Sequence, residues 1–347
     1  KVWGLRTAGL GVLSNIPGDA KPVSVIEDTA VSVQSLPNYI ADFQEMLNEY
    51  NLKAVYHAHI ATGELHLRPV LNLKDPVDVE LFRKVATRTA ELVKKYRGSL
   101  SGEHGDGRLR GEFIPFMLGQ NIYNELKNIK NVWDPQGIFN PGKIVNTPRM
   151  DASLRFEPGQ VTPEFKTYFD YKTSEGFVRA IERCNGSADC LKSEIMGGTM
   201  CPSYMATRNE LNSTRGRANV LREVIAHPSD LNWADDHEIF TSLELCLSCK
   251  ACKAECPSGV DMAKLKAEFL QNHYDANPVP FSTLLLAHYP VLMQWASKVP
   301  QLSNAVLSAK PLAWLVKKAF GFNIQRNLPR FHSKSLKFNS KYKSVET

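Results

Sequence analysis

The sequence lacks several features that would place it in a functional class at once. Its longest uncharged stretch, residues 276–297, could cross a membrane by length, but three prolines and a histidine interrupt it. We therefore predict a soluble or interfacial helical segment there. The opening KVWGLRTAGLGVL does not read as a signal peptide, and it begins with Lys, so we expect an excerpt of a longer protein. A glycine-rich loop that could cradle phosphates is also missing.

Cysteine is absent from residues 1–183, and all seven cysteines lie between Cys184 and Cys256. A disulfide framework would not need such crowding, and seven is an odd number. The distribution instead predicts metal ligation in a reducing compartment. We therefore expect a cytoplasmic protein, either free in the cytoplasm or bound at the periphery of the inner membrane.

Acidic residues are nearly absent from the C-terminal part of the chain. Residues 281–347 hold ten Lys and Arg but one acid, Glu346, which gives a net charge of +9. Basic tails with few apolar residues are typical of linkers and surface arms. We predict a solvated connector that permits weak contact with an anionic membrane surface, and no nucleic-acid partner. The whole chain, at 43% hydrophobic and 22% charged residues, has the composition of a globular protein.

Apolar periodicity predicts an α+β unit in residues 23–73 and a long helix after it. PVSVIEDTAV and AVYHAHIA have strand character, whereas LPNYIADFQEMLNEYNL has helical spacing. Asp75-Pro76 and Gly98 predict the ends of the following helix. This order favours a layered α+β domain with mixed strand pairing. Further on, we expect helices from Ser213 and Met262.

The run Cys246-x2-Cys249-x2-Cys252-x3-Cys256-Pro257 is typical of two-cluster ferredoxins. In such runs three cysteines hold one [4Fe–4S] cluster, and the fourth ligates the other cluster. Structural zinc sites instead favour paired C-x2-C hooks, so zinc fits this run less well.

A second cysteine group precedes this run and repeats it incompletely. Cys184, Cys190 and Cys201-Pro202 match its first, third and closing positions, and Ser187 stands where the second cysteine would be. Exchange of the closing ligands then predicts a complete [4Fe–4S] cluster held by Cys246, Cys249, Cys252 and Cys201. Cys184, Cys190 and Cys256 would hold a second cluster with three thiolates. It would be [3Fe–4S], or [4Fe–4S] with a ligand other than cysteine, or it would be absent.

Histidines and a carboxylate form a second constellation. Three histidines lie in YHAHIATGELH (residues 56–66), and a further motif is Gly102-Glu103-His104-Gly105. Two imidazoles and a carboxylate are a familiar ligand set for a zinc-like cation with an open coordination position. The competing interpretation is ordinary core or surface histidines. The flanking glycines favour a site, because glycine lets the backbone approach a ligand closely.

These motifs carry a family resemblance. His59-x6-His66, the Glu-His-Gly run at 103–105 and DPQGIFNPGK at 134–143 resemble the C-terminal domain of FAD-linked oxidases of the D-lactate and D-2-hydroxyglutarate dehydrogenase type. Residues 176–275 resemble the two-cluster helical ferredoxin domain of glycolate oxidase and succinate dehydrogenase iron–sulfur subunits. The combination is similar to the large bacterial FAD and iron–sulfur D-2-hydroxyglutarate dehydrogenases.

The resemblance implies roles for individual residues. His59, His66 and Glu103 match the family's ligands for a divalent metal, Zn²⁺ or Mn²⁺, and His104 matches its catalytic histidine. Hydride would pass from C2 of the substrate to FAD. Arg6 and Lys21 would bind substrate carboxylates, and Asn140 would lie against the flavin, as would the Glu103–His104 pair.

The sequence also departs from the family pattern at two places. Arg68 stands where simpler members have Asn, and Glu64 replaces an Asn. The FAD pyrophosphate-binding half would precede Lys1, so we expect FAD to be held mostly by a segment outside this chain.

The resulting hypothesis is part of an FAD- and iron–sulfur-dependent dehydrogenase. It would oxidise a D-2-hydroxy acid of the 2-hydroxyglutarate, lactate or glycolate class to the 2-oxo acid. Electrons would pass through the clusters to a quinone, an electron-transfer flavoprotein or a cytochrome. The alternatives are an electron-transfer subunit without substrate chemistry of its own and a zinc-structured interaction module.

The expected organisation has an α+β part followed by an all-α part. The α+β part is a partial FAD-linked oxidase substrate or cap domain, with a ferredoxin-like sheet covered by helices. We expect four segments: that oxidase domain at 1–146, a linker at 147–175, the helical iron–sulfur ferredoxin domain at 176–277, and a helical, basic extension or interdomain linker at 278–347.

Overall fold

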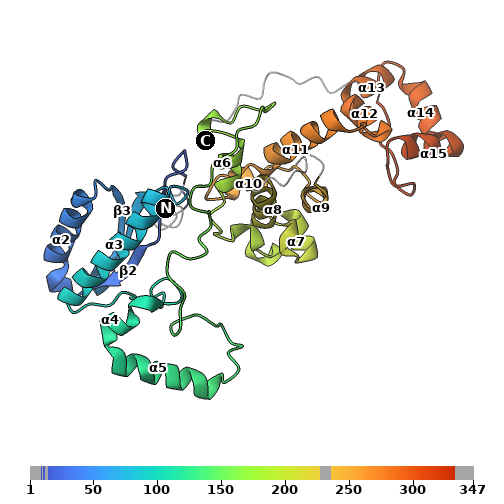
Figure 1. The fold of residues 1–347 in the computed structure, drawn as a ribbon. Coiled ribbons are helices and arrows are strands. Elements are labelled where there is room, and N and C mark those ends of the chain that lie inside the picture. Colours follow the sequence, from blue (N-terminus) through green and yellow to red (C-terminus); the bar gives the residue numbers. More distant parts are fainter. Residues whose placement is uncertain (1–8, 10, 12–14, 227–235, 333–347) are drawn as a thin grey trace. The chain divides into compact units, whose positions relative to one another are not determined.

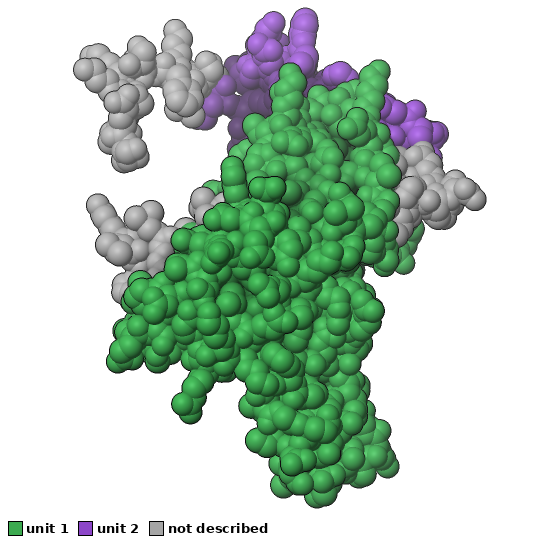
Figure 2. Space-filling view, turned by 60° about the vertical axis from the view of Figure 1, so that its left-hand side comes forward, with its two compact units in different colours: residues 1–269 green, residues 270–347 purple. Residues whose placement is uncertain are grey.

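The computed structural model describes residues 9, 11, 15–226 and 236–332 (Figure 1). Arg6 lies outside the described residues. The chain forms two compact units, Lys1–Phe269 and Leu270–Thr347 (Figure 2). Helices and a small antiparallel sheet make up the described residues, which confirms the expected mixture of both.

One sheet organises the first part of unit 1. Its strands are β1 (Lys21–Pro22), β2 (Ile26–Ala30), β3 (Ala54–His59) and β4 (Glu64–Leu71). β4 is the central strand, because β1, β2 and β3 all pair with it. All three pairings are antiparallel, so the predicted mixed pairing is wrong. A tight hairpin joins β3 to β4 and forces the antiparallel direction.

Two helices cover this sheet, α2 (Leu36–Glu49) and α3 (Pro76–Lys95) (Figure 1). The predicted start of α3 is confirmed: the Asp75 carboxylate accepts the Val77 N–H at 2.9 Å, and Pro76 occupies the first turn. The core between helices and sheet contains buried side chains from α2, α3 and β4: Tyr39, Phe43, Met46, Leu47, Leu65, Leu67, Leu71, Phe82, Val85, Ala86, Ala90 and Val93. Each large apolar side chain buried here contributes about 1.5–3 kcal/mol.

The sequence analysis missed β4 itself. Its first five residues, ELHLR, alternate between polar and apolar, but the polar Glu64 and His66 are buried as well, so the alternation does not mark a solvent-facing side. It also contains Pro69, which argues against a central strand by composition. Pro69 fits because it pairs with Ala54 at the start of β3, and its carbonyl accepts the Val23 N–H at 2.9 Å.

The regular elements in the rest of unit 1 are helices and 3-10 turns. A 3-10 turn, η3 (Gly111–Phe113), leads into α4 (Ile114–Leu118) and α5 (Gln120–Trp133). Between residues 176 and 269 every described regular element is a helix or a 3-10 turn. The α-helices are α6 (Phe177–Glu182), α7 (Pro202–Thr207), α8 (Thr214–Ala226), α9 (His237–Glu244), α10 (Ala251–Glu255) and α11 (Met262–Ala276). The predicted helices at α8 and α11 are confirmed.

Unit 2 contains four short helices after α11. They are α12 (Phe281–Ala287), α13 (Tyr289–Ala296), α14 (Pro300–Ser308) and α15 (Lys310–Ala319). A cavity among them is lined mainly by apolar side chains, including Met293, Leu307 and Phe320. Within the described ranges, every helix is too short or too polar to cross a bilayer.

Candidate functional site

The β3–β4 hairpin positions two of the predicted metal ligands. Gly63, with a φ of 77°, closes the turn between the strands, and any Cβ there would lie 1.9 Å from the Val31 carbonyl oxygen. The turn therefore requires glycine. It places His59 at the end of β3 and His66 on β4, with their ring centroids 5.2 Å apart. His66 is buried, whereas His59 is partly exposed.

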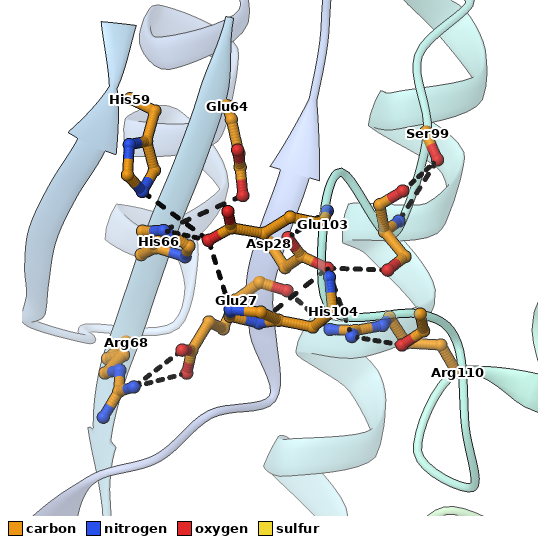
Figure 3. A network of polar contacts seen from close by, with 12 residues as sticks. Glu27, Asp28, His59, Glu64, His66, Arg68, Ser99, Glu103, His104 and Arg110 are labelled. Carbon is orange, nitrogen blue, oxygen red and sulfur yellow. Dashed lines mark hydrogen bonds and ion pairs between the residues drawn. The ribbon is translucent and has the colours of Figure 1, made fainter. Parts of the chain in front are cut away.

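The loop after α3 brings Glu103 and His104 to the same place (Figure 3). Glu103 Oε1 lies 3.6 Å from Nε2 of both His59 and His66. The His104 ring stacks on His66 with centroids 5.4 Å apart, and its Nε2 lies 3.3 Å from Glu103 Oε1. The structure thus brings together all four residues that the histidine motifs singled out.

This donor set fits a divalent cation. One ligand atom each from His59, His66 and Glu103 lie within 4.8 Å of one another. A buried oxygen of Glu64 lies 3.8 Å from His66 Nε2 and has no hydrogen-bond partner among the described residues. Two imidazoles and a carboxylate suit zinc and similar first-row metals.

Asp28, which the sequence analysis missed, supports the Glu103–His104 loop through hydrogen bonds to its backbone. It lies at a bulge in β2, has a φ of 79° and is fully buried. Its carboxylate accepts the backbone N–H groups of Glu103 at 2.9 Å and His104 at 3.0 Å, and the Ser101 hydroxyl at 2.6 Å. Burial alone would raise the pKa of Asp28, but these hydrogen bonds lower it to about 2.

Glu64 behaves in the opposite way to Asp28. Burial raises the pKa of Glu64 to about 7, and the neighbouring Asp28 and Glu103 carboxylates add to the rise. Below about pH 7, Glu64 therefore keeps a proton beside an ionised Asp28. Burial also lowers the pKa of His66, which favours the neutral imidazole that a metal requires.

Glycine and arginine complete the loop. A Cβ on Gly102 would lie 3.1 Å from the Glu64 side chain, and Gly105 has a φ of 77°. Arg110 donates at 2.7 Å to the carbonyls of Glu27 and Gly105. These contacts hold the loop at both ends.

Several other predicted residues lie away from this site. Lys21 pairs with Leu71, five residues along β4 from His66, which is roughly 16 Å at strand spacing. Burial lowers the pKa of Lys21, and the nearby acids Glu182 and Asp19 oppose that shift. Asn140 lies in an exposed turn after α5 with a φ of 48°. Arg68, by contrast, borders the site: its side chain donates at 2.7 Å to Glu27, whose carboxylate is one of the possible ligands grouped with His66 and His104.

The cysteines gather in the helical part of unit 1. Cys201, Cys246, Cys249 and Cys252 line one small cavity, although Cys201 is 45 residues from the next of them. The Thr214 backbone N–H donates to Cys201 Sγ at 3.0 Å. Hydrogen bonds of this kind to sulfur are a feature of cluster sites. The cavity therefore contains the four residues predicted for the complete cluster.

The other three cysteines are also neighbours. Burial raises the pKa of Cys184, and the Cys190 and Cys256 thiolates raise it further, so both lie close to it. The Arg215 backbone N–H donates to Cys190 Sγ at 3.3 Å. A hydrogen bond from Cys201 lowers the pKa of Cys190, so one residue of the three-thiolate set lies beside one residue of the complete-cluster set. Ser187 lies in an exposed loop.

Comparison with known proteins agrees with both parts. Residues 1–144 match the family described as FAD linked oxidases, C-terminal domain, and residues 183–261 match the 4Fe-4S dicluster domain. D-2-hydroxyglutarate dehydrogenase of Pseudomonas putida is 30% identical over 95% of the chain and 36% of its own length. The Escherichia coli protein of that name is 28% identical over 92% of the chain and 35% of its own length.

A more distant relative matches a smaller part. Glycolate oxidase subunit GlcD of Bacillus subtilis is 23% identical over 40% of the chain and 29% of its own length. The chain spans about a third of the length of the D-2-hydroxyglutarate dehydrogenases that match nearly all of it. The predicted resemblance is confirmed, because the chain matches both the C-terminal domain of the FAD linked oxidases and the 4Fe-4S dicluster domain.

Proposed function

We propose that this chain is part of an FAD- and iron–sulfur-dependent dehydrogenase that oxidises a D-2-hydroxy acid to the 2-oxo acid. One observation carries the proposal: His59, His66, Glu103 and His104 converge at one site, in a chain that also gathers seven cysteines. The proposal includes an oxidase domain at 1–146 and an all-α two-cluster domain at 176–277.

His59, His66 and Glu103 would hold Zn²⁺ or Mn²⁺. A bound cation would act as a Lewis acid on the substrate's hydroxyl and carboxylate. The chain's own contribution is to hold three ligand atoms within 4.8 Å of one another on a hairpin and a supported loop. Glu103 is about half exposed, which leaves one side of the site open to a substrate.

His104 is the candidate base for the proton of the 2-hydroxyl group. Its side chain is 45% exposed, so a substrate can reach it. Its Nδ1 lies 3.9 Å from the buried Asp28 carboxylate. That negative charge would stabilise the imidazolium that forms when Nε2 takes the proton. Hydride from C2 would go to FAD, which supplies the two-electron acceptor.

The remaining assignments in the oxidase domain rest on the resemblance alone. They are Arg6 and Lys21 for substrate carboxylates and Asn140 for the flavin. Lys21 lies in β1, opposite Leu71 at the end of β4, and this position adds no support to its role.

Two thiolate sites would carry electrons onward singly. Cys246, Cys249, Cys252 and Cys201 would hold [4Fe–4S], and Cys184, Cys190 and Cys256 would hold a second cluster with three thiolates. A quinone, an electron-transfer flavoprotein or a cytochrome would accept the electrons. All seven cysteines are free thiols, which suits the reducing cytoplasm, and the basic tail would allow contact with the inner membrane surface.

The test is flavin reduction by substrate in the full-length enzyme carrying His104→Gln. Anaerobic stopped-flow mixing with D-2-hydroxyglutarate, D-lactate or glycolate follows the loss of oxidised flavin absorbance. We expect reduction to slow by roughly 10²–10⁴-fold. The matched control is His57→Gln on the same hairpin, because His57 belongs to none of the ligand groups among the described residues.

Two outcomes would overturn the proposal. Unchanged flavin reduction in His104→Gln would favour an electron-transfer subunit whose histidine site is structural. Colourless, anaerobically purified protein with zinc bound at the cysteines would favour a zinc-structured interaction module. Metal analysis of the same preparation separates these cases, because iron–sulfur clusters give brown protein with bound iron and sulfide.

A further inference from the structure

A buried ionic cluster joins the oxidase domain to the dicluster domain. Its centre is the Lys74 ammonium group, whose side chain is only 4% exposed. Lys74 Nζ donates to Asp19 Oδ1 at 2.9 Å, to Thr162 Oγ1 at 2.6 Å, and to the two Glu182 oxygens at 2.9 and 2.8 Å. Arg179 donates to both Asp19 oxygens, at 3.0 and 2.7 Å. We call these five residues the Lys74 junction.

The members of the Lys74 junction come from four segments far apart in the sequence. Asp19 precedes β1, Lys74 follows β4, Thr162 belongs to the linker, and Arg179 and Glu182 lie on α6. Lys74 and Glu182 are 108 residues apart. Taking either charge away from its partner would leave a buried, unpaired ion, which is strongly unfavourable. The cluster therefore favours one arrangement of α6 against the end of β4.

The same face of the dicluster domain carries a second set of contacts. Arg183 donates to Asn15 Oδ1 at 3.2 Å, and Asn15 Nδ2 donates to the Pro257 carbonyl at 3.1 Å. A Cβ on Gly11 would lie 2.4 Å from Pro257 Cβ, so only glycine permits this approach. Arg183 and Pro257 are the chain neighbours of Cys184 and Cys256. The oxidase domain therefore contacts the dicluster domain beside these two cysteines.

The other cysteine site is built from residues of the dicluster domain itself. The cavity that contains Cys246, Cys249 and Cys252 is lined by residues between 201 and 263. The two sites thus differ in their position relative to the oxidase domain. The Cys184 site borders that domain, and the Cys246 site lies farther from it.

We propose that the Lys74 junction positions the Cys184–Cys190–Cys256 site so that electrons from the flavin enter there first. This inference rests on the proposed function. Reduced flavin gives up two electrons and one proton to return to its oxidised form. Each cluster accepts one electron at a time, and the proton goes to solvent. Electron transfer slows steeply with distance, so a loosened junction would slow this step while leaving hydride transfer from the substrate intact.

The experiment uses the full-length enzyme with Lys74→Met and, as the matched control, Lys84→Met. Lys84 is an exposed lysine on α3 that pairs with Glu80. Substrate reduction of the flavin is measured by stopped flow. Flavin-to-cluster transfer is measured after flash photoreduction of the flavin without substrate, and freeze-quench EPR identifies the first reduced cluster. Hydrogen exchange reports on residues 155–163 and 177–184.

We expect Lys74→Met to reduce the flavin at the wild-type rate and to pass electrons to the clusters roughly tenfold or more slowly, since displacements on the order of 1 Å can cost that much. Exchange in both peptides should rise, and the three-cysteine cluster should be reduced first in wild type. If Lys74→Met does not fold, the double variant Lys74→Met/Glu182→Leu removes both charges and keeps a packed side chain at each position.

Wild-type transfer rates despite increased exchange would overturn the positioning role. Earlier reduction of the cluster at Cys246, Cys249, Cys252 and Cys201 would overturn the entry point. Failure of the proposed function looks different: substrate would not reduce the flavin of the wild-type enzyme, whereas flash photoreduction would still test the junction.

Discussion

The histidine site and the cysteine sites of this chain are built in contrasting ways. The histidine site takes nitrogen and oxygen donors from a β-hairpin and from a loop 37 residues beyond His66, and its Glu103 and His104 are half exposed. The cysteine sites take thiols from short helices and turns and from the loops between them, and most of these thiols are buried. An open site suits a cation that must meet a substrate, whereas enclosure suits a group that only exchanges electrons.

Charge separates the two regions as clearly as burial. Three carboxylates besides Glu103 border the histidine site, from Glu27, Asp28 and Glu64. Cations border the thiols instead. The buried Arg217 lines the cavity of the Cys246 site, and Lys266 donates to the Cys246 carbonyl at 2.8 Å. Carboxylates strengthen the binding of a divalent cation, and positive groups stabilise thiolates.

The largest expected effect comes from removing a ligand at the cysteine sites, which tests whether these sites work independently of the histidine site. Cys246→Ser in the full-length enzyme removes one thiolate of the complete cluster, so we expect loss of that cluster's iron and loss of electron transfer to a dye acceptor. Flavin reduction by substrate should be unchanged, because the histidine site does not depend on these loops. Iron analysis and stopped-flow absorbance measure the two effects.

A neighbouring variant controls for damage to the loop. Leu247 is 70% exposed, and Leu247→Ala should keep both iron and electron transfer. Full iron in Cys246→Ser would show that Cys246 is not a ligand. Slow flavin reduction in Cys246→Ser would show that the two regions are not independent.

The next largest effect is expected at the β-hairpin that carries the histidine site. Gly63→Ala places a Cβ against the Val31 carbonyl oxygen and requires a left-handed φ, so we expect a loss of about 3 kcal/mol in the stability of the oxidase domain. Chemical denaturation followed by intrinsic fluorescence measures this loss. Gly137→Ala is the control, because Gly137 also has a positive φ, of 64°, but has open space around its Cβ position. Equal losses in both variants would mean that the hairpin contact adds nothing beyond backbone strain.

The contrast between the regions also explains what could be predicted from the sequence. The seven cysteines lie within 73 residues, and their spacing together with the ligand exchange of two-cluster ferredoxins predicted the four that line one cavity. The histidine motifs were found by residue type, but their meeting depends on the register of β3 with β4. β4 was missed because its alternating part, ELHLR, is short and Pro69 argues against a central strand.

Asp28 and Lys21 show the limit of reasoning from sequence. A single Asp within PVSVIEDTAV gives no sign that it will support a loop 75 residues away, because that contact follows from a bulge in β2 and from the path of the chain after α3. The family resemblance assigned Lys21 to the substrate carboxylates. That assignment stays a prediction: strand pairing puts Lys21 opposite Leu71, and Asp19 and Glu182 lie near it. In both cases long-range register, which local patterns do not contain, decides the position.

A smaller effect is expected when Asp28, which supports the Glu103–His104 loop, is changed. Asp28→Asn keeps the shape of the side chain but replaces the negatively charged carboxylate, whose two oxygens accept the Glu103 and His104 N–H groups, by a neutral amide. Changes in the groups that orient metal ligands typically weaken metal binding by about 10–100-fold. We expect that loss for Zn²⁺ or Mn²⁺ in competition titrations with a chelator, and unchanged iron content. Ser101→Ala, which removes one neutral donor to Asp28, should weaken metal binding less. Metal affinity equal to wild type in Asp28→Asn would show that the loop is held by Arg110 alone.

The smallest expected effect concerns the pH dependence of the metal-free oxidase domain. The pKa of Glu64 is raised from its ordinary 4.5 to about 7, so the folded state binds a proton that the unfolded state has lost between these values. Glu64 therefore makes stability fall as pH rises from about 4.5 to 7. The lowered pKa of His66 acts in the opposite direction, because protonation of its imidazole on acidification favours unfolding. Glu64→Gln removes the first contribution and leaves the second, so its melting temperature should rise relative to wild type as pH increases through this window. A constant difference between the two melting curves across the window would mean that Glu64 ionises normally. The cysteine domain, which has no such carboxylate pair among its described cluster residues, should show the same pH profile in both proteins.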